Sequence, residues 1–249
     1  MIKFEHVSKK FFQEKSQIEV LEKIDFSLKE GEFVTLFGPN GCGKTTLLNI
    51  ACGLEKADSG KITINNKDPE HSKTGFVFQN YNESLFPWRT ALENIEFALE
   101  IQGVSKKERI KKAEELLNKV GLLQHKDKYF YELSGGMKQL VAICRAIAYQ
   151  PDILLMDEPF SSLDYSTTRK MEMELLEIWQ ERKITTLFIS HDIDEAIILA
   201  DRVVVLSPRP ARIKEIIEIN LPRPRKLEMI TSDEFFTIRN KALQAFIYE

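Results

Sequence analysis

The sequence predicts an α/β fold built on a mostly parallel sheet, and two observations lead to this class. Short apolar runs alternate with segments of helical periodicity along most of the 249 residues, which is the pattern of repeated strand–helix units. A glycine-rich loop also separates the apolar run at residues 33–37 from a helical pattern. Both observations favour parallel strands that are joined by helices packed on the faces of one sheet.

Four short apolar runs are expected to form the buried strands of this sheet. They lie at residues 33–37, 153–156, 186–190 and 203–207. Between residues 78 and 150 the pattern is mainly helical, which predicts a helical subdomain inserted between two strands. Within it, residues 106–120 are predicted as a helix, because Ser105 and Glu108 form a capping-box pattern and Gly121 can end the helix.

The C-terminal part is expected to contribute a ribbon and a helix. Residues 203–207 and 212–219 are predicted to pair as two strands across a turn that contains two prolines. The last eighteen residues are predicted as a helix with Ser232 as its cap, since two acidic residues follow in the first turn.

The bulk composition excludes several classes of protein. With 35 basic and 38 acidic residues the net charge is −3, whereas nucleic-acid binders are more often basic. No apolar run approaches the length of a membrane span, and residues 1–20 lack the apolar core of a signal peptide. The three cysteines have no metal-ligand spacing and suit a reducing compartment. We therefore expect a cytoplasmic chain that meets a membrane only through a partner.

The glycine-rich loop matches the P-loop pattern of phosphate-binding proteins. It consists of Gly38, Pro39, Asn40, Gly41, Cys42, Gly43, Lys44 and Thr45, and Thr46 continues into the helical run. Glycines let backbone amides surround phosphate oxygens, Lys44 can neutralise the β- and γ-phosphates, and the Thr45 hydroxyl can bind Mg²⁺. An ordinary glycine turn would explain the glycines but not the adjacent lysine and threonine.

Two carboxylates follow the expected strand at residues 153–156. Asp157 is well placed to hold Mg²⁺ through water, and Glu158 can polarise an attacking water. A lone acid at a strand end is usually a solvated side chain, but a pair downstream of a P-loop favours a hydrolytic site. His191 follows the strand at 186–190 and can contact the γ-phosphate, although by itself it would be an ordinary helix cap.

A second candidate anion site lies at another glycine-rich helix start. Ser134, Gly135 and Gly136 open a helix that continues to Tyr149, and a helix N-terminus attracts anions. A monomer folded around one nucleotide has no use for two such sites, whereas a dimer in which this helix caps the other subunit's nucleotide does. The alternative is a simple N-cap with a flexible turn.

In their order and spacing these segments resemble the nucleotide-binding subunits of ATP-binding-cassette (ABC) transporters, from about Ile2 to about Arg225. The matching motifs are the Walker A loop at 38–45, the Q-loop glutamine Gln79, the signature at 133–139, the Walker B strand at 153–158, the D-loop at 162–164 and the switch histidine His191. Phe11 stands where the family stacks an aromatic ring on adenine, with the adjacent Phe12 as the alternative.

The resemblance implies a P-loop nucleotidase core with a mostly parallel sheet, an antiparallel β subdomain and an inserted helical subdomain at about residues 80–150. The ATP-binding domain would span residues 2–231 and a C-terminal helix residues 232–249. Two subunits would bind ATP and Mg²⁺ head to tail, and hydrolysis would reopen the dimer.

The resemblance also implies roles for individual residues. Glu158 would be the general base, His191 would sense the γ-phosphate, and Thr45, Gln79 and Asp157 would hold Mg²⁺. Contacts to ATP are expected from Phe11, the loop residues 38–45, Thr46 and, across the dimer, from Ser134, Gly135, Gly136, Gln139 and Asp164.

Finer resemblances point to importers of nitrate, sulfonate, taurine and related small anions. They lie at residues 75–79, 85–90, 93–95, 156–160 and 206–210. The implied partners are membrane permease subunits and a solute-binding protein, with this chain held at the cytoplasmic face of the inner membrane. The solute is chosen by other subunits, so the sequence does not identify it, nor does it identify the permease or any regulation by the C-terminal helix.

Other interpretations remain open. An exporter subunit is the nearest alternative, followed by a soluble iron–sulfur assembly ATPase. A translation-factor relative should carry two cassettes, and this chain has one. A chromosome ATPase should carry a long coiled coil between Lys44 and Ser134, where no sustained heptads occur.

Two further expectations concern cysteines and aromatic residues. Cys42 is expected to have a lowered thiol pKa, because a helix N-terminus and Lys44 stabilise a thiolate, while Cys52 and Cys144 are expected to be buried. Phe86 and Trp88 flank Pro87, and at least one of the two rings is expected at the surface as an anchor for a permease helix. Leu85 is expected to be buried.

Overall fold

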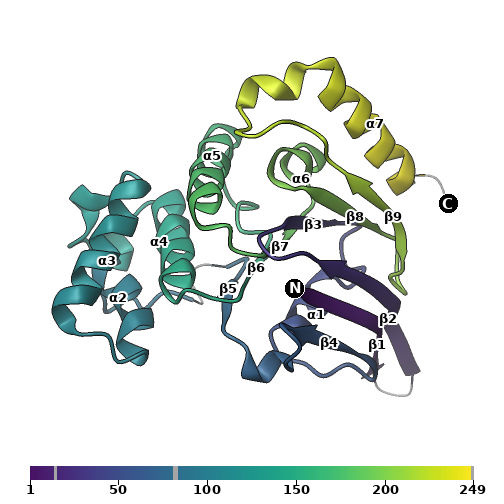
Figure 1. The fold of residues 1–249 in the computed structure, drawn as a ribbon, viewed down its shortest axis with the longest axis horizontal. Coiled ribbons are helices and arrows are strands. Elements are labelled where there is room, and N and C mark those ends of the chain that lie inside the picture. The colour runs from purple at the N-terminus through teal and green to yellow at the C-terminus, as the bar shows by residue number, and fades with distance from the viewer. Residues whose placement is uncertain (14–15, 81–83, 248–249) are drawn as a thin grey trace.

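The computed structural model describes residues 1–13, 16–80 and 84–247. A six-stranded sheet forms the centre of the molecule, in the order β5–β6–β7–β3–β8–β9 (Figure 1). The strands are β3 (Phe33–Phe37), β5 (Thr74–Val77), β6 (Ile153–Asp157), β7 (Thr186–Ser190), β8 (Arg202–Leu206) and β9 (Ile213–Glu218). All neighbours are parallel except β8 and β9. The predicted mostly parallel α/β sheet is confirmed.

The register of this sheet places the carboxyl ends of β3, β6 and β7 side by side. Phe37 of β3 pairs with Ser190 of β7, and Asp157 of β6 pairs with Ile189 of β7. In parallel strands these are the carboxyl ends, where ligands usually bind. The residues that follow them, Gly38, Glu158 and His191, therefore emerge together.

A second sheet covers one face of the first. It is antiparallel and joins β2 (Ser16–Leu28), β1 (Ile2–Gln13) and β4 (Ser59–Ile64). Helix α1 (Lys44–Ala51) lies with this sheet in one apolar cluster. Alternate residues of the central strands face different clusters: in β6, Leu155 joins this one and Leu154 joins the cluster of the remaining helices.

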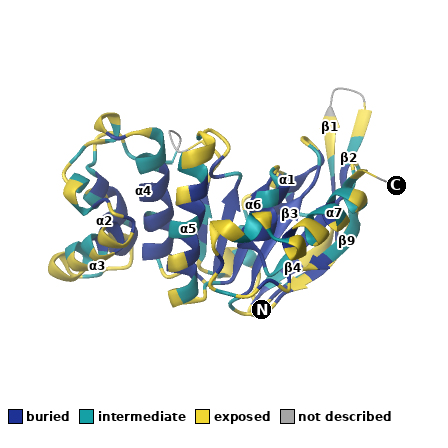
Figure 2. Cartoon of the chain, turned by 90° about the horizontal axis from the view of Figure 1, so that it is seen from above, coloured by how far each residue is buried: buried dark blue, intermediate teal, exposed yellow. Residues whose placement is uncertain are grey.

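Three helices lie between β5 and β6 in the sequence and form a separate group. In Figure 1 this group is at the left, beside β5 and β6. They are α2 (Ala91–Ile101), α3 (Lys106–Lys119) and α4 (Gly135–Ala148). Short 3₁₀ turns lie at Leu123–His125 and Phe130–Glu132. The predicted helix at 106–120 is present, and the Ser105 hydroxyl accepts a hydrogen bond from the Glu108 amide. Figure 2 shows α4 as the most buried of the three.

The last helices pack on the face of the central sheet opposite the antiparallel sheet. They are α5 (Tyr165–Arg182), α6 (Ile193–Leu199) and α7 (Asp233–Ile247). The hydroxyl of Ser232 caps α7 by accepting from the Phe235 amide, as expected for the C-terminal helix, whose last two residues lie outside the described part. Within the described ranges, none of the helices is long and apolar enough to cross a bilayer.

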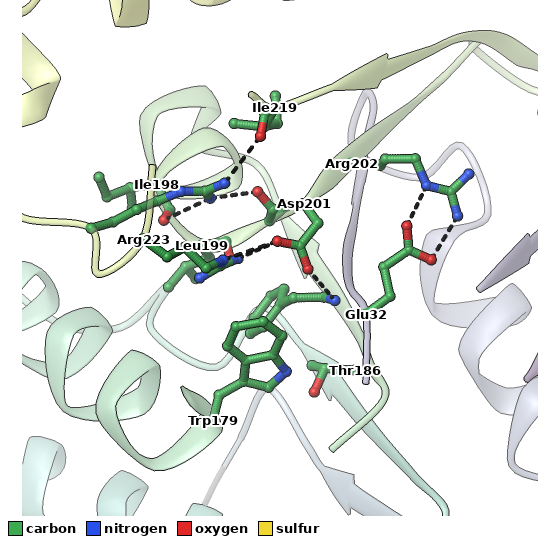
Figure 3. A network of polar contacts seen from close by, with 12 residues as sticks. Glu32, Trp179, Thr186, Ile198, Leu199, Asp201, Arg202, Ile219 and Arg223 are labelled. Atoms are coloured by element: carbon green, nitrogen blue, oxygen red, sulfur yellow. Dashed lines mark hydrogen bonds and ion pairs between the residues drawn. The ribbon is translucent and has the colours of Figure 1, made fainter. Parts of the chain in front are cut away.

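Two arginines fasten the segment between β9 and α7. Arg225 is buried and donates to the backbone oxygens of Ile197, Ile198, Ala200 and Ile219. In Figure 3, Arg223 reaches Asp201 and the carbonyl of Leu199, and its guanidinium lies 4.2 Å from the Trp179 ring centroid. The carbonyls at the end of α6, which lack partners within the helix, are thus satisfied by side chains.

Candidate functional site

The P-loop closes around the ammonium group of Lys44. Its Nζ donates to the carbonyls of Gly38 at 2.9 Å and Pro39 at 3.2 Å, and the side chain is buried. Gly43, with φ of 129°, lies where a Cβ would come within 2.8 Å of Val20 Cγ1. Only glycine therefore fits where the loop passes beneath β2.

Asp157 and Thr45 meet beside this loop. Asp157 ends β6 and is buried, and burial raises its carboxyl pKa while a hydrogen bond with the Thr45 side chain opposes that rise. A hydroxyl and a carboxylate side by side are oxygen ligands of the kind that Mg²⁺ prefers. Gln79 lines one cavity together with Thr45, and its Nε2 lies 3.5 Å from Ser161 Oγ.

Glu158 lies between a cation and the switch histidine. Its Oε1 is 3.7 Å from Lys44 Nζ, and its Oε2 is 3.0 Å from His191 Nδ1. The backbone of Glu158 has φ of 41°, in the left-handed region, and its amide donates to the carbonyl of Ile189. A strained backbone persists where its surroundings fix it, and such residues cluster at functional sites.

A cavity of about 380 Å³ joins these side chains. It is lined by Asn40, Gly41, Gly43, Lys44, Thr45, Thr46, Gln79, Glu158 and Arg209. A second cavity adjoins it along Asn40, Gln79 and Glu158 and reaches His191. The structure thus brings together the P-loop, the Q-loop glutamine, the Walker B carboxylates and the switch histidine.

Arg209 is a residue of this cavity that sequence reasoning missed. It lies in the turn after β8 and donates to the carbonyl of Gly41 at 2.5 Å. A bridge between Leu21 and Ala211 brings this turn against β2. The segment 206–210 was recognisable only as a family feature, and nothing local in the sequence shows that it meets the P-loop.

The signature residues lie on a different part of the chain. Ser134 is exposed, caps α4 and accepts from the Met137 amide, and Gly135 and Gly136 open that helix. None of them lines either cavity. Gln139 is fully buried in α4, and its expected contact with ATP stays a prediction.

Asp164 and Phe11 are also outside the two cavities. Asp164 is exposed and caps α5, where hydrogen bonds from Thr167 and Ser166 hold its carboxyl pKa well below its usual range. The Phe11 ring is 39% exposed on β1, with the ammonium of Lys9 at 5.1 Å from its centroid, and Phe12 is more exposed. The adenine contact stays a prediction.

The expected lowered thiol pKa of Cys42 was wrong, and Cys52 is less buried than expected. Cys42 is only 2% exposed, and burial raises its thiol pKa more than Lys44 lowers it. Cys42 belongs to the apolar cluster around α1 and does not line the 380 Å³ cavity at the P-loop. Cys144 is buried as expected, and burial raises its pKa to about 12, whereas Cys52 is half-buried.

The aromatic loop presents one ring to solvent. Trp88 is 70% exposed, while Phe86 is half-buried against Phe97 at 4.7 Å between ring centroids. The buried amide of Asn94 bonds both backbone groups of Phe86 and fixes this turn. Leu85 is buried, as expected. Tyr81, Asn82 and Glu83 of the same expected loop lie outside the described residues.

A P-loop and an acidic strand end at the carboxyl edge of a parallel sheet define a P-loop nucleotidase. The family model for the ABC transporter matches residues 21–161. This chain belongs to the ABC transporter family, as an ATP-binding subunit with an ATPase domain.

Two relatives span nearly the whole chain. An uncharacterized ABC transporter ATP-binding protein of Methanocaldococcus jannaschii is 47% identical over 244 residues, which cover 97% of this chain and 90% of that protein. The aliphatic sulfonates import ATP-binding protein SsuB of Bacillus cereus is 42% identical over 247 residues, which cover 98% of this chain and 95% of that protein.

Solved structures agree with the fold. A dimeric ATP-binding cassette in a post-hydrolysis state with ADP and phosphate has a TM-score of 0.78 at 33% identity, covering 89% of this chain and 100% of that one. CbiO1 of Clostridium perfringens, part of an ABC transporter complex, has a TM-score of 0.79 at 27% identity, covering 97% and 95%. The predicted fold class is confirmed.

Proposed function

We propose that this protein hydrolyses ATP to drive uptake of a small anion, of the sulfonate, nitrate or taurine class, through a membrane permease. The observation that carries hydrolysis is Glu158, held between Lys44 and His191 at the mouth of the phosphate cavity. Import is supported by the sulfonate-import relative, which this chain matches along nearly its full length.

In this proposal Glu158 is the general base. It accepts a proton from a water that attacks the γ-phosphorus, and the bond to the ADP oxygen breaks as the new bond forms. Lys44 neutralises the β- and γ-phosphates, and His191 binds the γ-phosphate while its Nδ1 keeps Glu158 oriented. The positive φ of Glu158 turns its side chain away from that of Asp157, so the two carboxylates take different roles.

The Thr45–Asp157 pair, with Gln79, fits a magnesium ion. Mg²⁺ is usually held by one or two protein oxygens together with substrate phosphates, and Thr45 and Asp157 offer these beside the loop. When bound, the ion supplies charge neutralisation on the phosphates. The contribution of the chain is to place a hydroxyl and a carboxylate where the phosphates enter.

The active form in this proposal is a head-to-tail dimer that contains ATP. Ser134 and Asp164 are exposed and lie outside the cavity of their own chain, so they are available to the second subunit. The dimeric cassette with ADP and phosphate supports this arrangement. The ATP-binding domain then spans residues 2–231, with the helical subdomain at about 80–150 and a C-terminal helix at 232–249.

The permease is proposed to dock beside Trp88. The exposed Tyr129 and Tyr131 stack at 5.8 Å between ring centroids, and a bridge from Thr90 to Tyr129 joins their segment to the Trp88 turn. Exposed aromatic residues are typical anchors of an interface. Through this contact the chain would sit at the cytoplasmic face of the inner membrane, with a solute-binding protein on the other side.

Reconstitution tests the direction and the solute. The chain is co-expressed with the permease and solute-binding protein encoded beside it and placed in vesicles. Addition of an alkanesulfonate, nitrate or taurine on the binding-protein side should stimulate ATP hydrolysis and carry the solute across. Stimulation only from the side of the ATP-binding subunit would instead establish the exporter alternative.

A further inference from the structure

A buried group of charged side chains lies behind the turn that presents His191. Arg169 of α5 donates to both carboxylate oxygens of Glu172, at 2.9 Å and 3.0 Å, and to Asp192 at 3.2 Å. Glu195 of α6 reaches the hydroxyl of Ser190. Glu172 is fully buried, and Arg169 and Glu195 are nearly so. None of these side chains lines the phosphate cavity.

The hydroxyl of Ser190 makes three contacts, and it has one proton. It accepts from the Asp192 amide at 2.9 Å, donates to the Asp192 carbonyl at 2.9 Å, and meets the carboxyl of Glu195. A hydroxyl has one donor and two acceptor sites. All three contacts are satisfied together only when the carboxyl of Glu195 brings the proton for the third.

The surrounding charges favour the same state. Arg169 is paired with Glu172 and Asp192, and its charge also acts on Glu195. Asp194 is paired with Arg239 of α7 at 2.9 Å. An ionised Glu195 would add a third negative charge around one cation in a buried place. Burial raises the pKa of Glu195 to about 8; the charges of Glu172 and Asp192 add to the rise, while the Ser190 hydrogen bond and the charge of Arg169 oppose it. Burial also raises the pKa of Glu172 to about 7 against the opposing charge of Arg169.

We infer that Glu195 is protonated at neutral pH and acts as a positioning residue, fixing the turn from Ser190 to Asp192 so that His191 meets Glu158. This inference rests on the proposed role of His191 in hydrolysis. When Glu195 ionises, the Ser190 proton turns toward it and the Asp192 carbonyl loses its donor. The turn then loses a bond and gains a buried charge.

The same group of charged side chains connects the D-loop helix α5 to the turn that carries His191. Glu195, His191 and Asp192 line a cavity of about 230 Å³ together with Tyr165 and Thr168 of α5. Helix α5 begins at the cap Asp164 of the D-loop. Arg169 and Glu172 thus tie the helix of the D-loop to the turn of the switch histidine.

Replacing Glu195 by glutamine tests whether the turn needs a neutral donor at this position, because an amide cannot ionise. Glu195→Gln keeps a neutral donor for Ser190, so its kcat at pH 7 should stay within about twofold of the wild type, whereas Glu195→Ala should lose about tenfold. The wild-type kcat should decline above about pH 8, the Glu195 pKa, and the decline should vanish in Glu195→Gln. Glu174→Gln, in the half-buried part of α5, is the matched control and should keep the wild-type profile.

An infrared measurement tests the proton without activity. The C=O stretching band of a protonated carboxyl should weaken at pH 7 in Glu195→Gln and stay unchanged in Glu174→Gln. An unchanged band in Glu195→Gln, or a pH profile identical to that of the wild type, overturns the inference. Hydrolysis that survives in His191→Ala would instead overturn the proposed role of His191, while the band still decides whether Glu195 is protonated.

Discussion

At the scale of single residues, the site depends on how Glu158 is held. Its side chain is only 14% exposed, and it contacts a cation on one side and a histidine on the other. A carboxylate in that position is oriented before substrate arrives, which is what a general base requires. Its neighbour Asp157 faces Thr45, so two adjacent acids have different partners.

Replacing Glu158 by glutamine should therefore abolish turnover while preserving the fold. Glu158→Gln keeps the shape but removes the base, and loss of a general base typically costs about 10²–10⁴-fold in rate. Phosphate release measures the loss, and size-exclusion chromatography with ATP should show a trapped dimer. Glu177→Gln, an exposed acid of α5, serves as the control. Turnover at the wild-type rate would remove Glu158 from the mechanism.

Cysteine labelling tests the packing of the P-loop. Burial raises the thiol pKa of both Cys42 and Cys52, but Cys42 is buried and Cys52 only half-buried, so brief alkylation should modify Cys52 first. Cys144 should stay unmodified in the folded protein, since it is fully buried. Peptide mass spectrometry gives the order. Rapid labelling of Cys42 that ATP prevents would show instead that the sulfur faces the nucleotide.

At the scale of elements, some helix ends are closed by local side chains and others by side chains from distant segments. Thr90 and Glu93 form a full capping box on α2, which is a local device. The end of α6 is different, because its carbonyls are satisfied by Arg225, which is more than twenty residues away. The segment from β9 to α7 is thereby attached to the end of α6.

Removal of this arginine should loosen the C-terminal segment. Arg225→Ala leaves several buried carbonyls without a donor, and hydrogen bonds from charged groups are worth about 1.5–3 kcal/mol each. We expect the free energy of unfolding to fall by about 3 kcal/mol in urea titrations. Lys226→Ala, at the exposed neighbour, should change it little. Equal effects of the two substitutions would show that Arg225 contributes no more than a surface charge.

At the scale of the whole molecule, the nucleotide site and the proposed permease contact lie in different layers. Gln79 lines the cavity shortly before the segment that leads to Trp88. The helices α2 and α4 that frame the Trp88 turn pack on each other away from the P-loop. In the proposed function, a change at the phosphates would reach the permease contact through the stretch of sequence between Gln79 and Trp88.

Trp88→Ala should separate ATP hydrolysis by the isolated subunit from its assembly with the permease. Because the ring is exposed, the isolated subunit should fold and hydrolyse ATP at close to the wild-type rate. Co-purification with the permease should fall about tenfold or more, as for loss of an aromatic anchor. Phe236→Ala, an exposed ring on α7, is the control and should not affect assembly. Loss of isolated ATPase activity in Trp88→Ala would place the ring in the core.

The sequence alone determined the fold class, five strands of the central sheet and the segments that carry the candidate phosphate site. A P-loop, an acidic strand end and a cap such as Ser134 are short segments whose residue types carry their own chemistry, so their spacing is sufficient. The predicted strands differ from the observed ones by a residue at most, because short apolar runs between turns leave few alternatives.

The tertiary structure alone decided which side chains meet. Arg209 reaches Gly41 across 168 positions of the sequence, and burial raises the pKa of Glu195, to which the charge of Glu172 on α5 adds. Cys42 carries every local sign of a reactive thiol, yet packing turns its sulfur into the core. Burial and charge pairing depend on contacts between distant segments, and the pKa of a group follows that environment and not its local pattern.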